Sequence, residues 1–153
     1  MTARASELDG LPVTVMGLGL FGGGVESARW LAARGARVTV TDLRDARALA
    51  ESIEALRGVD VRYVLGGHEE RDFTSAHTVV ANPAVPPGHP LLAAARNAGA
   101  RVTSETALFL EACRARLVLV TGTQGKSSTA HAAHGLIAAA GIPARLGGRH
   151  SSW

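Results

Sequence analysis

The chain has 153 residues, of which 46% are hydrophobic and 19% charged, a balance that suits a soluble globular protein with its own core. Its net charge of +3 comes from arginines scattered among acidic residues, without the basic stripe typical of nucleic-acid binding. No run approaches 18 apolar residues and no signal sequence is recognisable, so we predict no membrane span. The single cysteine, Cys113, excludes an intrachain disulfide and fits a cytoplasmic location.

The beginning of the chain predicts one strand–helix–strand unit after a loose leader at residues 1–11. The apolar run Pro12–Met16 predicts a buried strand, which ends at a glycine-rich turn. A helix is expected at 23–34, because its apolar side chains recur every three or four residues. Gly35 would end that helix, and the alternating segment 36–41 predicts the next strand.

The following segments continue the alternation of strand and helix. Gly66–His68 predicts a turn, and three prolines fix the shape of the loop Asn82–Gly88. Helices are expected at 46–57, 90–98 and 107–112, and strands at 61–65, 77–81 and 101–103. This order predicts an α/β fold, a Rossmann-like doubly wound parallel sheet.

The glycine-rich turn Gly17-x-Gly19-x-x-Gly22 matches the fingerprint of dinucleotide-binding loops. Gly17 would permit the tight turn, Gly19 would let the backbone approach a pyrophosphate, and Gly22 would let helix and strand pack closely. Asp42 ends the second strand, where a carboxylate can bind a ribose hydroxyl. NAD(P) and a uridine diphosphate both fit this pattern, and a turn that only packs the sheet is the remaining alternative. Arg44 would stack on a base, meet a phosphate or be solvated.

A second glycine-rich turn contains Lys126, the one lysine of the chain. A strand at 117–121 and a helix at 126–140 are expected on either side of it, which predicts the first βα unit of a P-loop ATPase domain. The glycine at 122 departs from the usual spacing of that motif. The expected ATP and Mg²⁺ ligands are Gly122, Thr123, Gln124, Gly125, Lys126, Ser127 and Ser128, with the ammonium of Lys126 on the phosphates and the hydroxyl of Ser127 on the metal.

These two loops together carry a family resemblance. Thr121–Ser128 resembles the ATP loop of the Mur ligases, and the first loop with Asp42–Arg44 resembles the UDP-binding domain of their D-glutamate-adding, MurD-type branch. Val80–Val85 and Ser104–Phe109 add to the similarity, which extends over about residues 12–148. The resemblance implies a UDP-binding Rossmann-like domain at 12–113 and the start of the central ATP-binding domain at 114–153.

The resemblance also implies an activity. Mur ligases of this branch form an amide bond between D-glutamate and UDP-N-acetylmuramoyl-L-alanine through an acyl phosphate, using ATP and Mg²⁺, in peptidoglycan precursor synthesis. Lys126 would be catalytic, because its charge neutralises the transferring phosphoryl group. The UDP-binding positions would be Gly17, Gly19, Leu20, Phe21, Gly22, Asp42, Leu43, Arg44 and Ala84. We expect a cytoplasmic monomer, truncated after the second loop and inactive alone.

Three positions depart from the family pattern. Phe21 stands where serine or threonine is frequent, Ala84 where glycine is usual, and Gln124 where asparagine is commoner. Two other functions remain open: the NAD(P)-binding domain of an oxidoreductase, and a nucleotide-binding remnant without catalysis. The oxidoreductase explains the first loop but not Lys126.

Other polar side chains have weaker functional interpretations. Glu105 begins a helix, so helix capping explains it better than a magnesium or substrate role. His131 and His134 lie three residues apart but lack a third metal ligand. The acidic stretch at 69–72 is expected to be a solvated loop, and the remaining histidines to be scattered.

Overall fold

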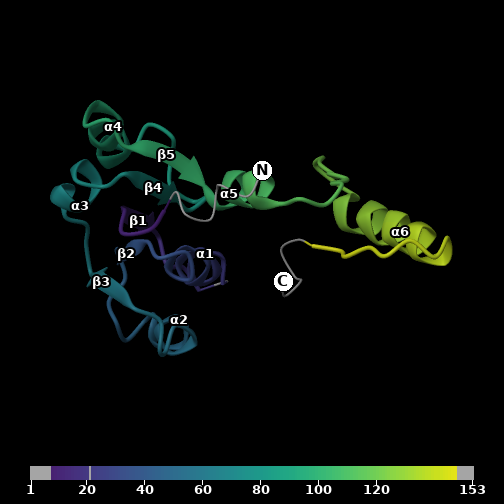
Figure 1. The fold of residues 1–153 in the computed structure, drawn as a ribbon, viewed down its shortest axis with the longest axis horizontal. Coiled ribbons are helices and arrows are strands. Elements are labelled where there is room, and N and C mark those ends of the chain that lie inside the picture. The colour runs from purple at the N-terminus through teal and green to yellow at the C-terminus, as the bar shows by residue number, and fades with distance from the viewer. Residues whose placement is uncertain (1–7, 21, 148–153) are drawn as a thin grey trace. The chain divides into compact units, whose positions relative to one another are not determined.

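The computed structural model describes residues 8–20 and 22–147, and the chain divides into two compact units, with the division between Cys113 and Arg114 (Figure 1). The first unit alternates strands and helices. Within the described residues, the second unit contains one helix, α6 (Lys126–Ala139).

The first unit is built on a five-stranded, fully parallel sheet with the strand order β3-β2-β1-β4-β5. Valine and threonine dominate these strands, as expected for segments that are covered on both faces. The strands are β1 (Pro12–Met16), β2 (Arg37–Asp42), β3 (Val61–Leu65), β4 (Thr78–Ala81) and β5 (Arg101–Ser104).

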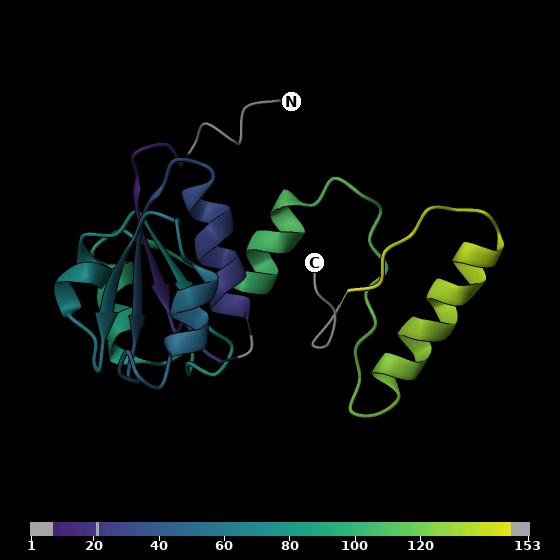
Figure 2. The ribbon, with the colours of Figure 1, turned by 90° about the horizontal axis from the view of Figure 1, so that it is seen from below.

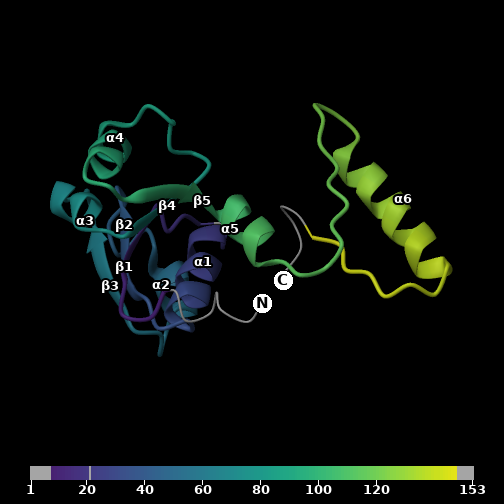
Figure 3. The same cartoon turned by 45° about the horizontal axis from the view of Figure 1, so that its top comes forward.

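Helices cover both faces of the sheet (Figure 3). One face carries α1 (Gly23–Ala32), α2 (Ala50–Ala55) and α5 (Glu105–Ala112), and the opposite face carries α3 (Glu70–Thr74) and α4 (Pro90–Asn97). The chain therefore winds to both sides of a parallel sheet, as the sequence predicted.

The two faces have separate hydrophobic clusters because side chains alternate along each strand. Val13 and Val15 of β1 belong to the cluster under α1, together with Leu31. Met16 points to the other face, where it packs with Phe73 of α3. Strand β1 is therefore held by packing on both faces, and the glycine loop starts from this fixed strand.

Two parts of the first unit differ from the sequence-based expectation. Residues 8–11 are not loose: Leu8 packs on the core, and the N–H of Gly10 donates to the Gly35 carbonyl at 2.8 Å. The acidic stretch 69–72 is not a solvated loop but begins α3. Asp72 there is 7% exposed and pairs with Arg62 of β3, which offsets the cost of burying its charge.

The second unit lacks the strand predicted at 117–121, so that prediction was wrong. A strand needs a neighbouring strand for its N–H and C=O groups, and the described residues of this unit, 114–147, contain none. The side chains of Val118 and Leu119 are exposed instead. The helix after the loop is present, but none of its residues is buried.

Candidate functional site: the carboxyl edge of the sheet

The glycine loop leaves β1 at the point where the strand order reverses. From β1 the chain proceeds outward to β2 and β3 on one side, while β4 and β5 lie on the other. In sheets of this kind, the crevice at the carboxyl ends of the strands beside such a switch point is where ligands bind. The loop lies at that edge, followed by α1 (Figure 2).

Asp42, at the carboxyl end of β2, is bonded to the glycine loop. It is 4% exposed, and its Oδ2 accepts from the N–H of Gly19 at 3.1 Å. Its Oδ1 accepts from the N–H of Arg44 at 2.9 Å, and the Arg44 guanidinium lies 3.6 Å from the same oxygen. Ser52 of α2 supports the loop from another side, since its hydroxyl donates to the Gly19 carbonyl at 2.7 Å. Asp42 thus organises the loop, whereas its predicted contact with a ligand stays a prediction.

Asn82, at the end of β4, closes the other side of the loop. A Cβ atom added to Gly17 would lie 2.9 Å from the Asn82 Cβ, so the space allows only glycine there. The side-chain oxygen of Asn82 accepts from the N–H of Ala84 at 3.0 Å, which shapes the proline-rich loop that follows. This hydrogen bond joins the backbone of Ala84 to Asn82, the residue that lies against Gly17 of the glycine loop.

Gly22, the third glycine of the fingerprint, does not have the predicted role of letting helix and strand pack closely. Gly22 caps α1 with φ at +88°, a conformation that favours glycine, but a Cβ there would meet nothing within 4 Å. The close approach of helix and strand occurs at Gly24, where a Cβ would overlap the carbonyl oxygens of Gly17 and Leu18. The sequence prediction placed this packing role two residues too early.

Three of the predicted UDP-binding side chains lie at the surface around this loop. Leu20 is 51% exposed and Leu43 72% exposed, so both present apolar surface to the solvent. The Arg44 side chain is about half exposed. Phe21 lies outside the described residues. Leu20, Leu43 and Arg44, together with Gly17, Gly19, Gly22, Asp42 and Ala84, lie at one edge of the sheet, which we call the switch edge.

A histidine pair at the switch edge was missed by sequence reasoning. The turn after β3 is bonded to the end of β2, with the Gly67 N–H donating to the Asp42 carbonyl at 3.1 Å. This turn brings His68 to Thr41, whose hydroxyl lies 2.6 Å from the His68 Nδ1. The ring of His89, the N-cap of α4, stands edge-on at 6.3 Å between centroids. Burial and the neighbouring His89 hold the pKa of His68 below its ordinary value, and Asp42 opposes them.

Glu105 lies on the other side of the glycine loop, at the start of α5, which runs alongside α1 (Figure 2). Ser104 caps α5, accepting from the Ala107 N–H at 3.2 Å, as predicted. The Glu105 carboxylate extends to α1, so closely that a Cβ on Gly23 would overlap its Oε2. Burial raises the pKa of Glu105 above its ordinary value.

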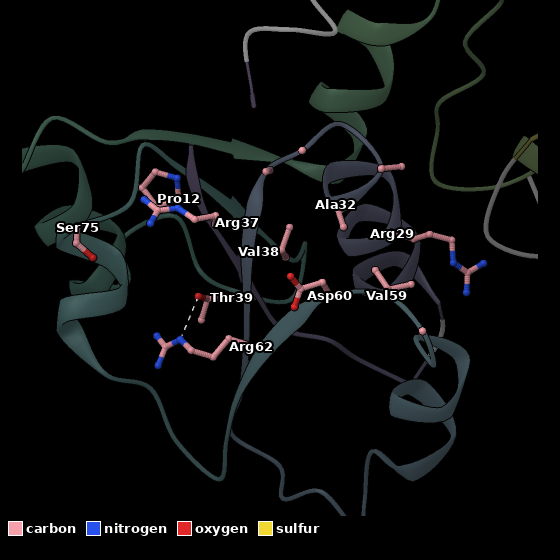
Figure 4. Close-up of a pocket in the computed structure, with 14 residues that line it drawn as sticks. Pro12, Arg29, Ala32, Arg37, Val38, Thr39, Val59, Asp60, Arg62 and Ser75 are labelled. Atoms are coloured by element: carbon pink, nitrogen blue, oxygen red, sulfur yellow. Dashed lines mark hydrogen bonds between the residues drawn. The ribbon is translucent and has the colours of Figure 1, made fainter. Parts of the chain in front are cut away.

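Two cavities flank the sheet of the first unit. One of about 290 Å³ lies at the carboxyl ends of β4 and β5, with Asn82 and Ser104 in its wall, and so adjoins the switch edge. The other, about 920 Å³ and open, lies at the amino ends of the strands (Figure 4). Two of the arginines in its wall form hydrogen bonds within the protein: Arg37 donates to the Gly10 carbonyl, and Arg62 donates to the Thr39 hydroxyl. Because this cavity lies at the amino ends of the strands, it is on the opposite edge of the sheet from the glycine loop.

The second glycine turn, Thr121–Gly125, precedes α6 in the second unit. Gly125 caps the helix with φ at +72°. The Lys126 ammonium folds back over the turn and donates to the carbonyls of Gly122 and Thr123, at 2.5 and 3.4 Å. The expected ATP ligands lie on this turn and on the first three residues of α6, and all of them are exposed.

The described residues give no support for another metal site. Residues 8–20 and 22–147 contain no group of three His, Cys, Asp or Glu side chains placed to hold a metal. His131 Nδ1 lies 2.8 Å from the Ser127 carbonyl oxygen and His134 Nε2 3.3 Å from that of Ala144, so both bond to backbone. In the same part of the chain, no helix is both long and apolar enough to span a membrane.

The family model described as "Mur ligase MurD-like, N-terminal domain" matches residues 12–104, which include every strand of the sheet. The chain belongs to the MurD-like Mur ligases. This membership agrees with the resemblance inferred from the two glycine loops.

Curated relatives of this Mur ligase chain carry the name UDP-N-acetylmuramoylalanine–D-glutamate ligase. One from Treponema pallidum is 48% identical over 143 residues, covering 92% of this chain and 27% of its own length. One from Trichlorobacter lovleyi is 49% identical over 142 residues, covering 93% of this chain and 31% of its own length. The chain therefore spans less than a third of these relatives.

A solved structure supports the fold of this Mur ligase chain. It is a pseudomurein peptide ligase type C from Methanothermus fervidus, with a TM-score of 0.54 and 22% identity, and the match covers 86% of this chain and 26% of that protein. At this identity the likeness concerns the fold alone.

Proposed function

We propose that this chain binds the UDP part of UDP-N-acetylmuramoyl-L-alanine and supplies the phosphate loop of an ATP-dependent ligase that adds D-glutamate to it. The observation that carries the proposal is the convergence of Gly19, Asp42 and Asn82 at the switch edge of a MurD-like domain. The names of the relatives give the substrate pair.

The switch edge has the chemistry that a uridine diphosphate requires. Helix α1 begins at the loop, and the N–H groups of a first helical turn lack partners within the helix, so they can bind phosphate oxygens. Leu20 and Leu43 offer exposed apolar surface for a base, and Arg44 a cation beside them. These features support binding of the diphosphate at the loop and of the uracil near the end of β2.

The residues of the second turn fit a triphosphate with Mg²⁺. Lys126 donates to two carbonyls of its own turn, contacts that an arriving phosphate would replace with a stronger charged partner. Gly122, Thr123, Gln124, Gly125 and Ser128 would hold the phosphates, and the Ser127 hydroxyl the metal. ATP bound there would supply the phosphoryl group that activates the substrate carboxylate.

The chain's own groups contribute positioning and charge. Asp42 and Ser52 fix the glycine loop before the ligand arrives, which lowers the entropy lost on binding. The ammonium of Lys126 would stabilise negative charge at the phosphates, the catalytic role predicted for it.

The test is a calorimetric titration of the chain with UDP-N-acetylmuramoyl-L-alanine and, separately, with NADH. We expect a saturable heat with the UDP compound that weakens at least tenfold in Gly19→Val, because the Cβ and methyls of valine would stand where the loop approaches the diphosphate. Gly88→Val, at an open position of the proline-rich loop, is the control. Binding of NADH without binding of the UDP compound would instead support the oxidoreductase alternative.

A further inference from the structure

Glu105 is a half-buried carboxylate that the activity proposed above does not use. Its Oε2 fills the space above Gly23, the first residue of α1, and its Oε1 is a buried oxygen without a hydrogen-bond partner in the described structure. An ionised carboxylate left in that state is costly, because burial removes water without a replacing donor.

The other charged groups near Glu105 do not neutralise it. On α1, which packs against α5, Glu26 is paired with Arg29. On β5, which also packs against α5, Arg101 is paired with Glu111 near the end of α5. Burial is accordingly the cause that raises the pKa of Glu105.

A diphosphate at the start of α1 would bring further negative charge to this carboxylate. Two like charges at a partly buried site repel strongly, so one of them must lose its charge or move. A diphosphate diester has no proton-binding group near neutral pH, whereas a carboxyl with a raised pKa can accept a proton. Once protonated, Glu105 has an O–H to donate to a phosphate oxygen.

We infer that Glu105 is a positioning residue for the diphosphate, which binds at the glycine loop together with one proton taken up by the Glu105 carboxyl. This inference rests on the proposed function. When ionised, the carboxylate repels anions at the start of α1, and when protonated it becomes a hydrogen-bond donor to the diphosphate.

The experiment measures proton uptake when the 153-residue chain binds UDP-N-acetylmuramoyl-L-alanine. Calorimetry at pH 6, 7 and 8, in buffers with different ionisation enthalpies, gives the number of protons taken up. We expect a net uptake of protons on binding, and an affinity that falls as the pH rises, by at most about tenfold per pH unit. Uridine, which has no diphosphate, should bind without proton uptake.

Two variants separate this role from a structural one. Glu105→Gln keeps the shape without the charge, so it should bind with no proton uptake, with an affinity independent of pH and at least threefold tighter than that of the unsubstituted chain at pH 8. Glu111→Gln, on the same helix but exposed, should behave like the unsubstituted chain.

Three results would overturn the inference. One is binding of the UDP compound to the unsubstituted chain without proton uptake, and another is proton uptake that persists in a folded Glu105→Gln. The third, no binding of the UDP compound at all, would overturn the proposed function and this inference with it. The measurement on the unsubstituted chain does not depend on whether a variant folds.

Discussion

The two turns of this chain are both rich in glycine, but they lie in different surroundings. The first turn is held by three other elements: Asp42 from β2, Ser52 from α2 and Asn82 from the end of β4. The second turn is held by Lys126 of its own helix. The comparison shows that a glycine-rich sequence is enough to form a turn, whereas contacts from neighbouring strands and helices are needed to hold the turn rigid for binding.

The helices that follow the two turns show the same contrast. Helix α1 buries Gly24, Val25, Ala28 and Leu31 against the sheet, whereas α6 buries none of its residues. Most helical stability in proteins comes from such packing, since isolated helices of this length are marginal in water. The second unit should therefore be the less stable part.

The largest expected effect is in amide hydrogen exchange. Amides of β1 and β4 should be protected about 1,000-fold more than those of α6, because they open only with the whole sheet. Exchange measured by mass spectrometry on the intact chain gives both values at once. Equal protection in β1 and α6 would contradict the contrast between the two units.

Glycine-to-alanine substitution should have opposite signs in the two helices. Gly24→Ala should destabilise the first unit by about 3 kcal/mol, because the new methyl would overlap two backbone carbonyls that cannot move away. Gly135→Ala in α6 meets open space and should raise helix content, by about 0.8 kcal/mol in helix propensity. Urea unfolding and circular dichroism measure the two effects, and a tolerated Gly24→Ala would refute the close packing.

Removing Asp42 should loosen the first turn. Asp42→Ala leaves the N–H groups of Gly19 and Arg44 without their acceptor, at a cost of about 2 kcal/mol in the free energy of unfolding. Asp45→Ala, which removes an exposed acceptor for the Ala48 N–H, should cost less than about 1 kcal/mol. Equal losses in urea unfolding would mean that Asp42 does not organise the loop.

The smallest effect concerns pH. Because burial raises the pKa of Glu105, its contribution to stability is fully present below its ordinary pKa and is lost as pH rises through the raised value. Glu105→Gln should therefore be more stable than the unsubstituted chain at pH 8, with the advantage shrinking towards pH 4. Urea midpoints at the two pH values test this, and an advantage that grows on acidification would contradict the burial of Glu105.

The sequence predicted the parts of the fold that depend on local pattern. The strand Pro12–Met16 and the glycine turn are both contained in short, periodic segments. The strand expected at 117–121 failed because strands depend on distant partners, which a local pattern does not contain. Helix α3 was also missed, and its buried Asp72 pairs with Arg62 of β3, a contact that the local pattern does not contain.

The candidate site divides in the same way. The fingerprint identified Gly17, Gly19 and Asp42, which the structure brings to one edge. The pairing of His68 with His89 and the contact of Glu105 with Gly23 join residues 21 and 82 positions apart in the chain. Side chains that far apart are brought together by the winding of the sheet, and no spacing in the sequence signals it.

The most direct test of the central claim is a map of backbone amide shifts by NMR while UDP-N-acetylmuramoyl-L-alanine is added to the chain. The account predicts shifts at the switch edge, at 17–24, 42–44 and 82–84, and at Glu105, which contacts the start of α1, with none in α6. Shifts around the open cavity at the amino ends of the strands, or none at the glycine loop, would contradict it.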